Sequence, residues 1–399
     1  MINCHTHLFT SDHVPTDLLK LYAPLPNIIL RPMNYILNSW LGDKLLGWTV
    51  KYGWEDLKRY GNFLRLGYQA TIEEQFGVLK NAYPENTRFV VLTQDFSFVS
   101  EYKPQEGYTY LDYKRQIYEL KLKYPGIILP FHFIEPRLVS YSQDPIDLLE
   151  SMKLDFINGW SVGLKMYPAE GYYPFDFRIN AVYAFAQEHQ IAIMTHASVG
   201  GSRYVKQTSE LDRYPIDLDG NVISIQIPDL SRMKPNYTER AKYYSDPDNY
   251  KKVLNKYPKL KICMAHAGSD EEIRKEIKNR ESKMNEDNWY RKVLDLVDSN
   301  ENVYVDISYS LHSLEFIEKL ILVDFNLKSD DPKVKRRCTR LLFGTDFYLT
   351  YQEYLPKSKD NSAIERNLWE PVSQKIGKEL FALISEKNAI EYLKSSFYN

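Results

Sequence analysis

The sequence predicts a single (β/α)8 barrel, the TIM barrel, on three observations. Eight short apolar segments rich in β-branched residues recur along the 399-residue chain. Most of them are apolar on both faces, which is typical of parallel strands covered by helices. Segments with helical spacing separate them, for example residues 144–156 and 177–189. Eight such units in one chain are the number that closes a barrel.

The expected strands, in chain order, are residues 2–7, 88–96, 126–136, 163–168, 191–198, 259–268, 302–310 and 340–347. Two intervals, approximately 8–86 and 199–257, are much longer than a crossover needs, so we expect insertions over the barrel mouth. Within the second, Asp219 and Gly220 stand between alternating residues and predict a small β-hairpin. A last helix over 382–396 is expected on the barrel exterior. Residues 1–399 are interpreted as one domain.

The composition of the chain argues against nucleic acid and anionic membranes as binding partners. Lys and Arg number 51 against 53 Asp and Glu, so no net field attracts nucleic acid or an anionic membrane. Three scattered cysteines predict neither a disulfide framework nor a thiolate metal cluster. Because the sequence shows neither a recognisable signal segment nor a long apolar span, we expect a cytoplasmic protein. The expected partner is a small-molecule substrate, and the sequence leaves a homo-oligomer open.

Polar residues that can bind a metal stand near the carboxyl ends of five expected strands, where this architecture builds its active sites. They are His5 and His7 in the first strand, Lys165 in the fourth, His196 in the fifth, His266 in the sixth and Asp346 in the eighth. His5 and His7 face the same way, with α-carbons roughly 6 to 7 Å apart, so two imidazoles can converge on one cation. A His-x-His pair alone is weak evidence. Unrelated buried polar groups would each cost roughly 1 to 3 kcal/mol if unpaired, which favours one shared site.

Neutral imidazole and carboxylate are the ligands that a divalent ion such as zinc prefers, and catalytic sites leave one position open for water. Such an ion lowers the pKa of bound water to about 7 and polarises a carbonyl oxygen, so we expect hydrolysis by metal-bound hydroxide. Asp346 is expected to hold the metal through one oxygen and to take the proton of the water with the other. His266, or a residue near it, would stabilise the charge that develops on the substrate.

Lys165 raises a separate question, because an ammonium group in a metal site would repel the ions beside it. Carboxylation of its amine by carbon dioxide would instead give an anionic oxygen pair that can bridge two metals. Alternatively, Lys165 stays an ammonium and binds a substrate carboxylate. Arg137, Tyr167 and Arg203 follow strand ends and are candidate substrate-binding residues; for each, a loop salt bridge is the alternative.

Several motifs resemble the amidohydrolase superfamily, and more narrowly the amidohydrolase-related branch that includes decarboxylase and lactonase members. They are "HTH", "MTHAS", "CMAHAG", "NVYVDIS" and "FGTDF". The segment "GLKMYPAEGYYP" is similar to the lysine strand of dihydroorotase-like members, in which the lysine is carboxylated and bridges two metals. The resemblance implies a buried metal on His5, His7 and Asp346, an outer metal on His196 and His266, and Lys165 on both.

The resemblance leaves two points open. Many members of the branch bind a single metal and lack the lysine, so one or two divalent ions are expected. Hydrolysis of an amide, cyclic amide or lactone carbonyl is the main prediction. The alternative is metal-dependent, non-oxidative decarboxylation of an unsaturated or aromatic acid.

Overall fold

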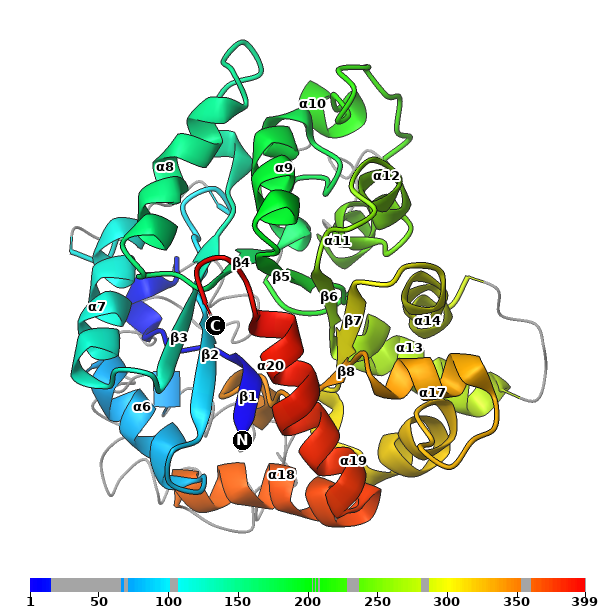
Figure 1. The fold of residues 1–399 in the computed structure, drawn as a ribbon. Coiled ribbons are helices and arrows are strands. Elements are labelled where there is room, and N and C mark those ends of the chain that lie inside the picture. Colours follow the sequence, from blue (N-terminus) through cyan, green and yellow to red (C-terminus); the bar gives the residue numbers. More distant parts are fainter. Residues whose placement is uncertain are drawn as a thin grey trace, which may run out of the picture.

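Eight parallel strands form one sheet in the order β1 to β8, with helices around it (Figure 1), and this confirms the predicted TIM barrel. The structure is a computed structural model that describes residues 1–15, 66–67, 71–100, 107–202, 204, 206, 209–227, 237–280, 287–352 and 360–398. The strands are β1 Ile2–Thr6, β2 Arg88–Leu92, β3 Ile128–Phe133, β4 Gly163–Met166, β5 Ala192–His196, β6 Ile262–Ala265, β7 Val303–Asp306 and β8 Leu341–Leu342. Each lies inside the segment predicted for it.

The segment that follows β8 closes the barrel against β1. The Cys4 N–H donates to the Phe343 carbonyl at 2.8 Å, and the His7 N–H donates to the Phe347 carbonyl at 2.8 Å. Thr6 and Phe347 also form a parallel bridge. Both segments that form these contacts carry predicted metal-binding residues. The barrel therefore closes at the same place where the predicted site forms.

The helices that lead from strand to strand begin at polar capping residues in several cases. They are α6 Ile72–Asn81, α7 Tyr110–Lys123, α8 Ile146–Ile157, α9 Asn180–Glu188, α12 Asn249–Lys256, α13 Asp270–Asn279, α14 Trp289–Ser299, α17 Pro332–Cys338 and α18 Asn361–Ile376. Thr71 caps α6, and Thr109 forms a capping box with Asp112 at the start of α7, so free N–H groups of the first turn are satisfied. The predicted helices at 144–156 and 177–189 are α8 and α9.

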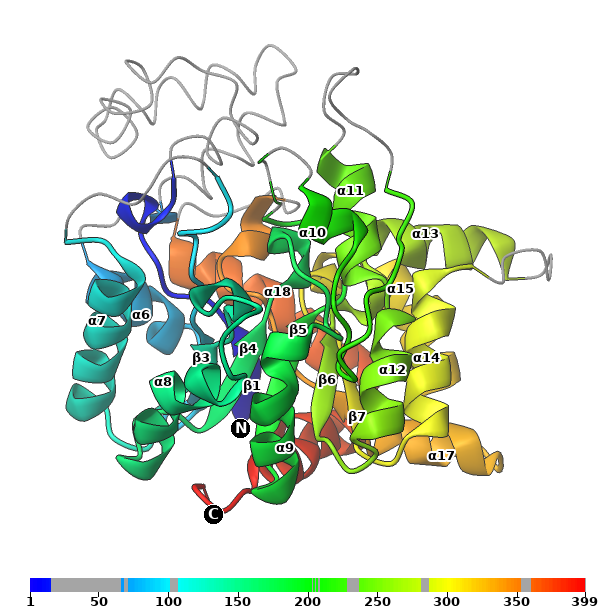
Figure 2. The ribbon, with the colours of Figure 1, turned by 90° about the horizontal axis from the view of Figure 1, so that it is seen from above.

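The two long intervals end in crossover helices, α6 and α12. In the second interval, α10 Glu210–Arg213 precedes the hairpin and α11 Tyr237–Ser245 packs against the 3-10 turn Pro168–Glu170 after β4. The predicted hairpin is confirmed, because Ile216 pairs antiparallel with Val222. Figure 2 shows α10 and α11 at the end of the barrel opposite the N-terminus. Residues 16–65, 68–70 and 228–236 lie outside the described residues, so their placement over the mouth stays a prediction.

The C-terminal helix closes the amino end of the barrel, where the N-terminus lies (Figure 1). It runs through α19 Lys378–Ala382, a π-helical turn at Leu383–Lys387 and α20 Asn388–Leu393. Tyr392 and Leu393 belong to the same buried cluster as inward-facing strand residues such as Leu92 and Met194. The Lys261 ammonium donates to the carbonyls of Glu391 and Lys394, which anchors the end of the helix. This placement corrects the expectation of a helix on the barrel exterior.

No helix in the described part of the chain combines the length and the apolar character needed to cross a membrane.

Candidate metal centre

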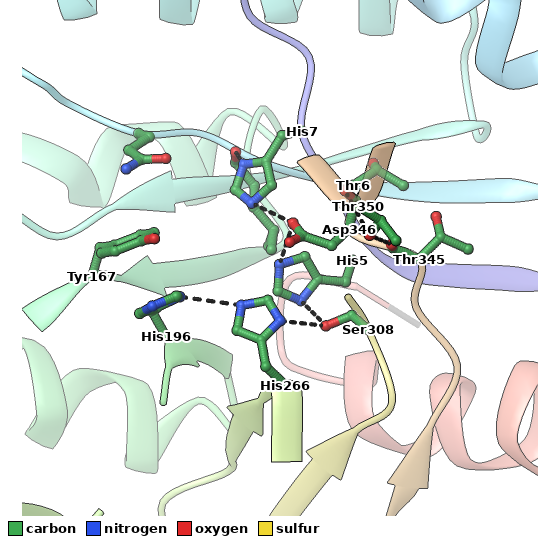
Figure 3. A network of polar contacts seen from close by, with 12 residues as sticks. His5, Thr6, His7, Tyr167, His196, His266, Ser308, Thr345, Asp346 and Thr350 are labelled. Carbon is green, nitrogen blue, oxygen red and sulfur yellow. Dashed lines mark hydrogen bonds and ion pairs between the residues drawn. The ribbon is translucent and has the colours of Figure 1, made fainter. Parts of the chain in front are cut away.

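The four histidines and the aspartate of the predicted metal site converge at the carboxyl end of the barrel (Figure 3). The ring centroids of His5 and His7 lie 5.3 Å apart, those of His5 and His266 4.8 Å, and those of His196 and His266 4.9 Å. Asp346 Oδ1 lies 3.4 Å from His5 Nε2 and 3.4 Å from His7 Nε2. All five side chains are buried. Residues from both ends of the sequence therefore form one cluster.

The inner part of the cluster consists of His5, His7 and Asp346. His5 Nδ1 contacts the Asp306 carboxylate at 2.7 Å, and His7 Nδ1 donates to the Leu92 carbonyl at 3.0 Å. A hydrogen bond at one ring nitrogen fixes the orientation of the ring and leaves the other nitrogen as the ligand. In both residues the remaining nitrogen is Nε2, which faces Asp346 Oδ1. We call these three atoms the inner group.

The outer part of the cluster consists of His196 and His266. His196 Nε2 donates to the Gly200 carbonyl at 2.8 Å, and His266 Nδ1 contacts the Ser308 hydroxyl at 2.9 Å. The remaining nitrogens, His196 Nδ1 and His266 Nε2, face each other at 3.1 Å. We call these two atoms the outer group. The same pattern, one nitrogen anchored and one turned inward, thus holds for all four histidines.

The electrostatic environment suits cation binding. Burial lowers the pKa of His196 to about 3, with a further contribution from Lys165, and burial lowers the pKa of His266 and of His7 well below the usual value. These rings are therefore neutral at pH 7, which is the form that binds metals. His5 differs: burial lowers its pKa, but Asp306 and Asp346 outweigh burial and raise it.

Both carboxylates are ionised at neutral pH. Burial alone would raise the pKa of Asp306, but His5 and His266 hold it at about 2. Burial also opposes ionisation of Asp346, whose pKa is nevertheless lowered by His5, His7 and Lys165. Two buried negative charges beside mostly neutral imidazoles require positive charge nearby.

Three buried polar atoms of the predicted metal-binding residues make no hydrogen bond within the described structure: His5 Nε2, Asp346 Oδ1 and Lys165 Nζ. Leaving such a group unpaired costs roughly 1 to 3 kcal/mol, so three of them in one place would be a large penalty. A divalent cation supplies the missing partner for the nitrogen and the carboxylate oxygen. The donor atoms present, imidazole nitrogen and carboxylate oxygen, therefore fit a divalent metal.

A family model described as amidohydrolase matches residues 161–394, more than half of the chain. The chain is a member of the amidohydrolase family. The match includes Lys165, His196, His266 and Asp346 and begins after His5 and His7. No curated protein matches this amidohydrolase.

The solved structures that are similar to this amidohydrolase include the following two. One is 5-carboxyvanillate decarboxylase from Novosphingobium aromaticivorans complexed with manganese, with a TM-score of 0.53, 12% identity, and coverage of 98% of this chain and 95% of the other. The second is a probable 2-pyrone-4,6-dicarboxylic acid hydrolase from Acinetobacter baumannii, with a TM-score of 0.50, 13% identity and coverage of 98% of both chains. At these identities the likeness supports the barrel fold alone. The resemblance of the lysine strand to dihydroorotase-like members stays a prediction.

The backbone of the amidohydrolase is strained at two of the predicted metal-binding residues. His266 has φ of 67° and Asp346 has φ of 57°, a left-handed conformation that is uncommon outside glycine. Such residues cost on the order of 1 to 3 kcal/mol and cluster at functional sites, where the surrounding structure holds them in place. The strain accompanies sharp turns just after β6 and after β8, which direct both side chains into the cluster.

Sequence reasoning gave no role to Asp306 and Ser308. Asp306 ends β7 and holds His5 Nδ1, and its other oxygen accepts from the His266 N–H at 2.8 Å. The Ser308 hydroxyl contacts both His5 Nδ1 at 3.1 Å and His266 Nδ1 at 2.9 Å. A signal was present, because Asp306 is an acidic residue within a predicted strand, 302–310, as Lys165 is a basic residue within the predicted strand 163–168.

The predicted substrate-binding residues have different environments. The Arg137 guanidinium pairs with Glu135 through two hydrogen bonds of 2.6 Å and donates to the Glu170 carbonyl at 2.7 Å, which is the loop salt bridge left open as the alternative. Tyr167 stacks on His196 with ring centroids 3.9 Å apart, and its hydroxyl accepts from the Ser202 N–H at 3.0 Å. Arg203 lies outside the described residues.

Proposed function

We propose that the protein is a metal-dependent hydrolase that acts on an amide, cyclic amide or lactone carbonyl of a small molecule. The observation that carries this proposal is the orientation of the four histidines: each has one anchored nitrogen and one nitrogen turned toward the centre. When bound, a divalent ion, with zinc as the expected one, supplies an activated water and polarises the substrate carbonyl.

The residues around the centre have separable roles in this reaction. Asp346 is ionised and buried, with Oδ1 committed to the inner group, so its other oxygen is the proposed acceptor of the proton from the attacking water. His266 is the proposed stabiliser of charge on the substrate oxygen. Tyr167 packs flat on His196 and fixes the position of that ring.

Lys165 is the residue that decides the number of metals. Its amine is fully buried and makes no hydrogen bond within the described residues, and burial lowers its pKa to about 8. A neutral fraction is therefore available near pH 7, and only the neutral amine adds carbon dioxide. The charge of Lys165 acts on His7 of the inner group and on His196 of the outer group. We propose a carboxylated Lys165 that bridges two ions.

The same amine also supports a second candidate, metal-dependent decarboxylation of an unsaturated or aromatic acid. If Lys165 remains an ammonium, it is a buried cation beside the metal-binding residues and can bind the substrate carboxylate. This reading requires a single metal and an unmodified lysine.

The experiment that separates these functions combines metal analysis with product analysis. Protein produced with zinc and manganese is assayed on lactones and cyclic amides, and separately on aromatic and unsaturated carboxylic acids. Hydrolysis incorporates one oxygen of labelled water into the product, whereas decarboxylation releases carbon dioxide. Activity that disappears with a chelator and returns with added metal supports the metal-dependent reaction. Protein that binds no metal under these conditions would overturn both candidates.

A further inference from the structure

A second polar network lies behind the inner group and involves none of the predicted metal-binding side chains. It consists of Asn3 on β1, Tyr83 just after α6, Thr345 just after β8, and Glu365 on α18, all of them buried. Asn3 is two residues before His5, and Thr345 directly precedes Asp346, as Figure 3 shows for the latter pair. The network therefore includes residues from both segments that carry the inner group, one residue near His5 and one next to Asp346.

Asn3 is the centre of this network. Its side-chain oxygen accepts from the backbone N–H of His5 at 3.2 Å and from that of Thr345 at 3.3 Å. Its side-chain nitrogen donates to the Tyr83 hydroxyl at 2.9 Å and to the Thr345 hydroxyl at 2.9 Å. A primary amide offers two donors and two acceptor positions, and here all four are used. Only one orientation of the amide satisfies these partners.

The outer side of the network is fixed by α18. The Tyr83 hydroxyl donates to the Glu365 carboxylate at 2.7 Å, and the Tyr83 ring stacks on Trp369 of the same helix with centroids 5.2 Å apart. Tyr83 therefore cannot move away from Asn3 without breaking contacts to α18. Movement of Asn3 or Tyr83 would leave buried polar groups unpaired, which is costly, so these bonds hold the two side chains in place; the second oxygen of Glu365, Oε2, takes no part in them.

The connection matters because Asn3 and Thr345 are 342 positions apart in the sequence. The inner group combines side chains from these two distant segments, and a single backbone hydrogen bond joins the ligand-bearing residues directly, from Asp346 N–H to the His5 carbonyl at 2.9 Å. Asn3 adds two further bonds, one to each segment. Its amide thus limits how far the two segments can separate.

We propose that Asn3, held by Tyr83 and Glu365, is a positioning residue that fixes His5 relative to Asp346 and thereby sets the metal affinity of the inner group. The inference rests on the metal site of the proposed function. Asn3 contacts neither ion nor substrate in this role and acts through the backbone of its neighbours.

The test measures the dissociation constant for zinc by competition with a chromophoric chelator. Substitution of residues that orient metal ligands typically weakens metal binding 10- to 100-fold, and we expect this for Asn3→Ala. Tyr83→Phe keeps the ring and removes the hydroxyl, so a smaller loss in the same direction is expected. The matched control is Tyr118→Phe, which removes a buried hydroxyl that donates to Asp155 at 2.8 Å on another side of the barrel. The control should bind zinc like the unmodified protein.

Each outcome is decisive. Unchanged zinc affinity in both network variants, with normal binding by the unmodified protein, overturns the positioning role and leaves the metal site standing. An equal loss in Tyr118→Phe shows a general effect of destabilisation and also overturns it. An unmodified protein that binds no zinc or manganese removes the metal site itself. If Asn3→Ala does not fold, the zinc affinity of Tyr83→Phe alone tests the proposal.

Discussion

Replacing Gly344 with alanine tests whether the close approach of two distant segments builds the inner group. A Cβ atom at residue 344 would lie 2.5 Å from His5 Cβ and 3.2 Å from His5 N. Non-bonded carbon atoms rest about 3.5 to 4.0 Å apart, so the segments would have to separate by roughly 1 Å. Ligand distances in metal sites hold to within about 0.2 Å. Such a displacement would remove Asp346, two residues further along, from the reach of an ion held by His5.

Two effects are therefore expected in Gly344→Ala. The free energy of unfolding of the metal-free protein should fall by about 1 to 3 kcal/mol, the usual cost of inserting a carbon into a packed interior. Zinc affinity should fall at least about tenfold, following the loss of orientation of metal ligands. Urea unfolding and chelator competition measure the two quantities independently.

The control for Gly344→Ala is Gly77→Ala in α6, where an added Cβ would meet nothing within 4 Å. Alanine is the better helix former, so this variant should be as stable or more stable by about 0.4 to 1 kcal/mol, with unchanged zinc affinity. If Gly344→Ala loses stability but binds zinc as tightly as the unmodified protein, the contact does not set the geometry of the metal-binding residues. That result would refute the reasoning.

Four further substitutions give distinct outcomes. Asp346→Asn should abolish turnover while circular dichroism stays unchanged; retained turnover would remove Asp346 from proton transfer. Lys165→Ala should lower the metal content measured by mass spectrometry from two ions toward one, and an unchanged content would argue against the bridge. Asp306→Ala should weaken zinc binding 10- to 100-fold, because His5 loses its carboxylate partner at Nδ1 and keeps only the Ser308 hydroxyl; equal binding constants would contradict that role. Burial raises the pKa of Glu170 from 4.5 to about 8, so its contribution to stability is full below pH 4.5 and is lost as the pH rises through 8. At 1.36 kcal/mol per unit the loss is on the order of 5 kcal/mol. Urea unfolding at pH 5 and pH 9 should show a smaller loss in Glu170→Gln than in the unmodified protein, and equal losses would exclude Glu170 as the source.

The strands were predictable because each is a short apolar segment bounded by turn residues, a pattern that depends only on neighbours in the sequence. The clustering of the predicted metal-binding residues followed from one rule of the architecture, that side chains at the carboxyl ends of parallel strands meet. Both inferences require only the order of the elements along the chain and do not require any distance between atoms. This is why His196 and Asp346 could be placed together from the sequence.

Other features depend on contacts that no local pattern encodes. Asp306 has its role because it lies next to His5. The two residues come together only when the last strands of the barrel pack beside the first. The apolar residues Tyr392 and Leu393 indicate a helix with a buried face, but they do not say which surface that face covers; the structure places it at the amino end of the barrel. For Arg137 the sequence left two equally suitable interpretations, a substrate-binding residue or a loop salt bridge, and only the geometry identifies Glu135 as its partner.

The inner group has a consequence for the order of events during synthesis and folding. Its two histidines, His5 and His7, are made more than three hundred residues before its carboxylate, Asp346. A nascent chain therefore cannot form the complete inner group until residue 346 has left the ribosome. An ion bound there would connect two segments that are distant in the sequence, as a cross-link does, and its release would destabilise β1 and the turn after β8 together.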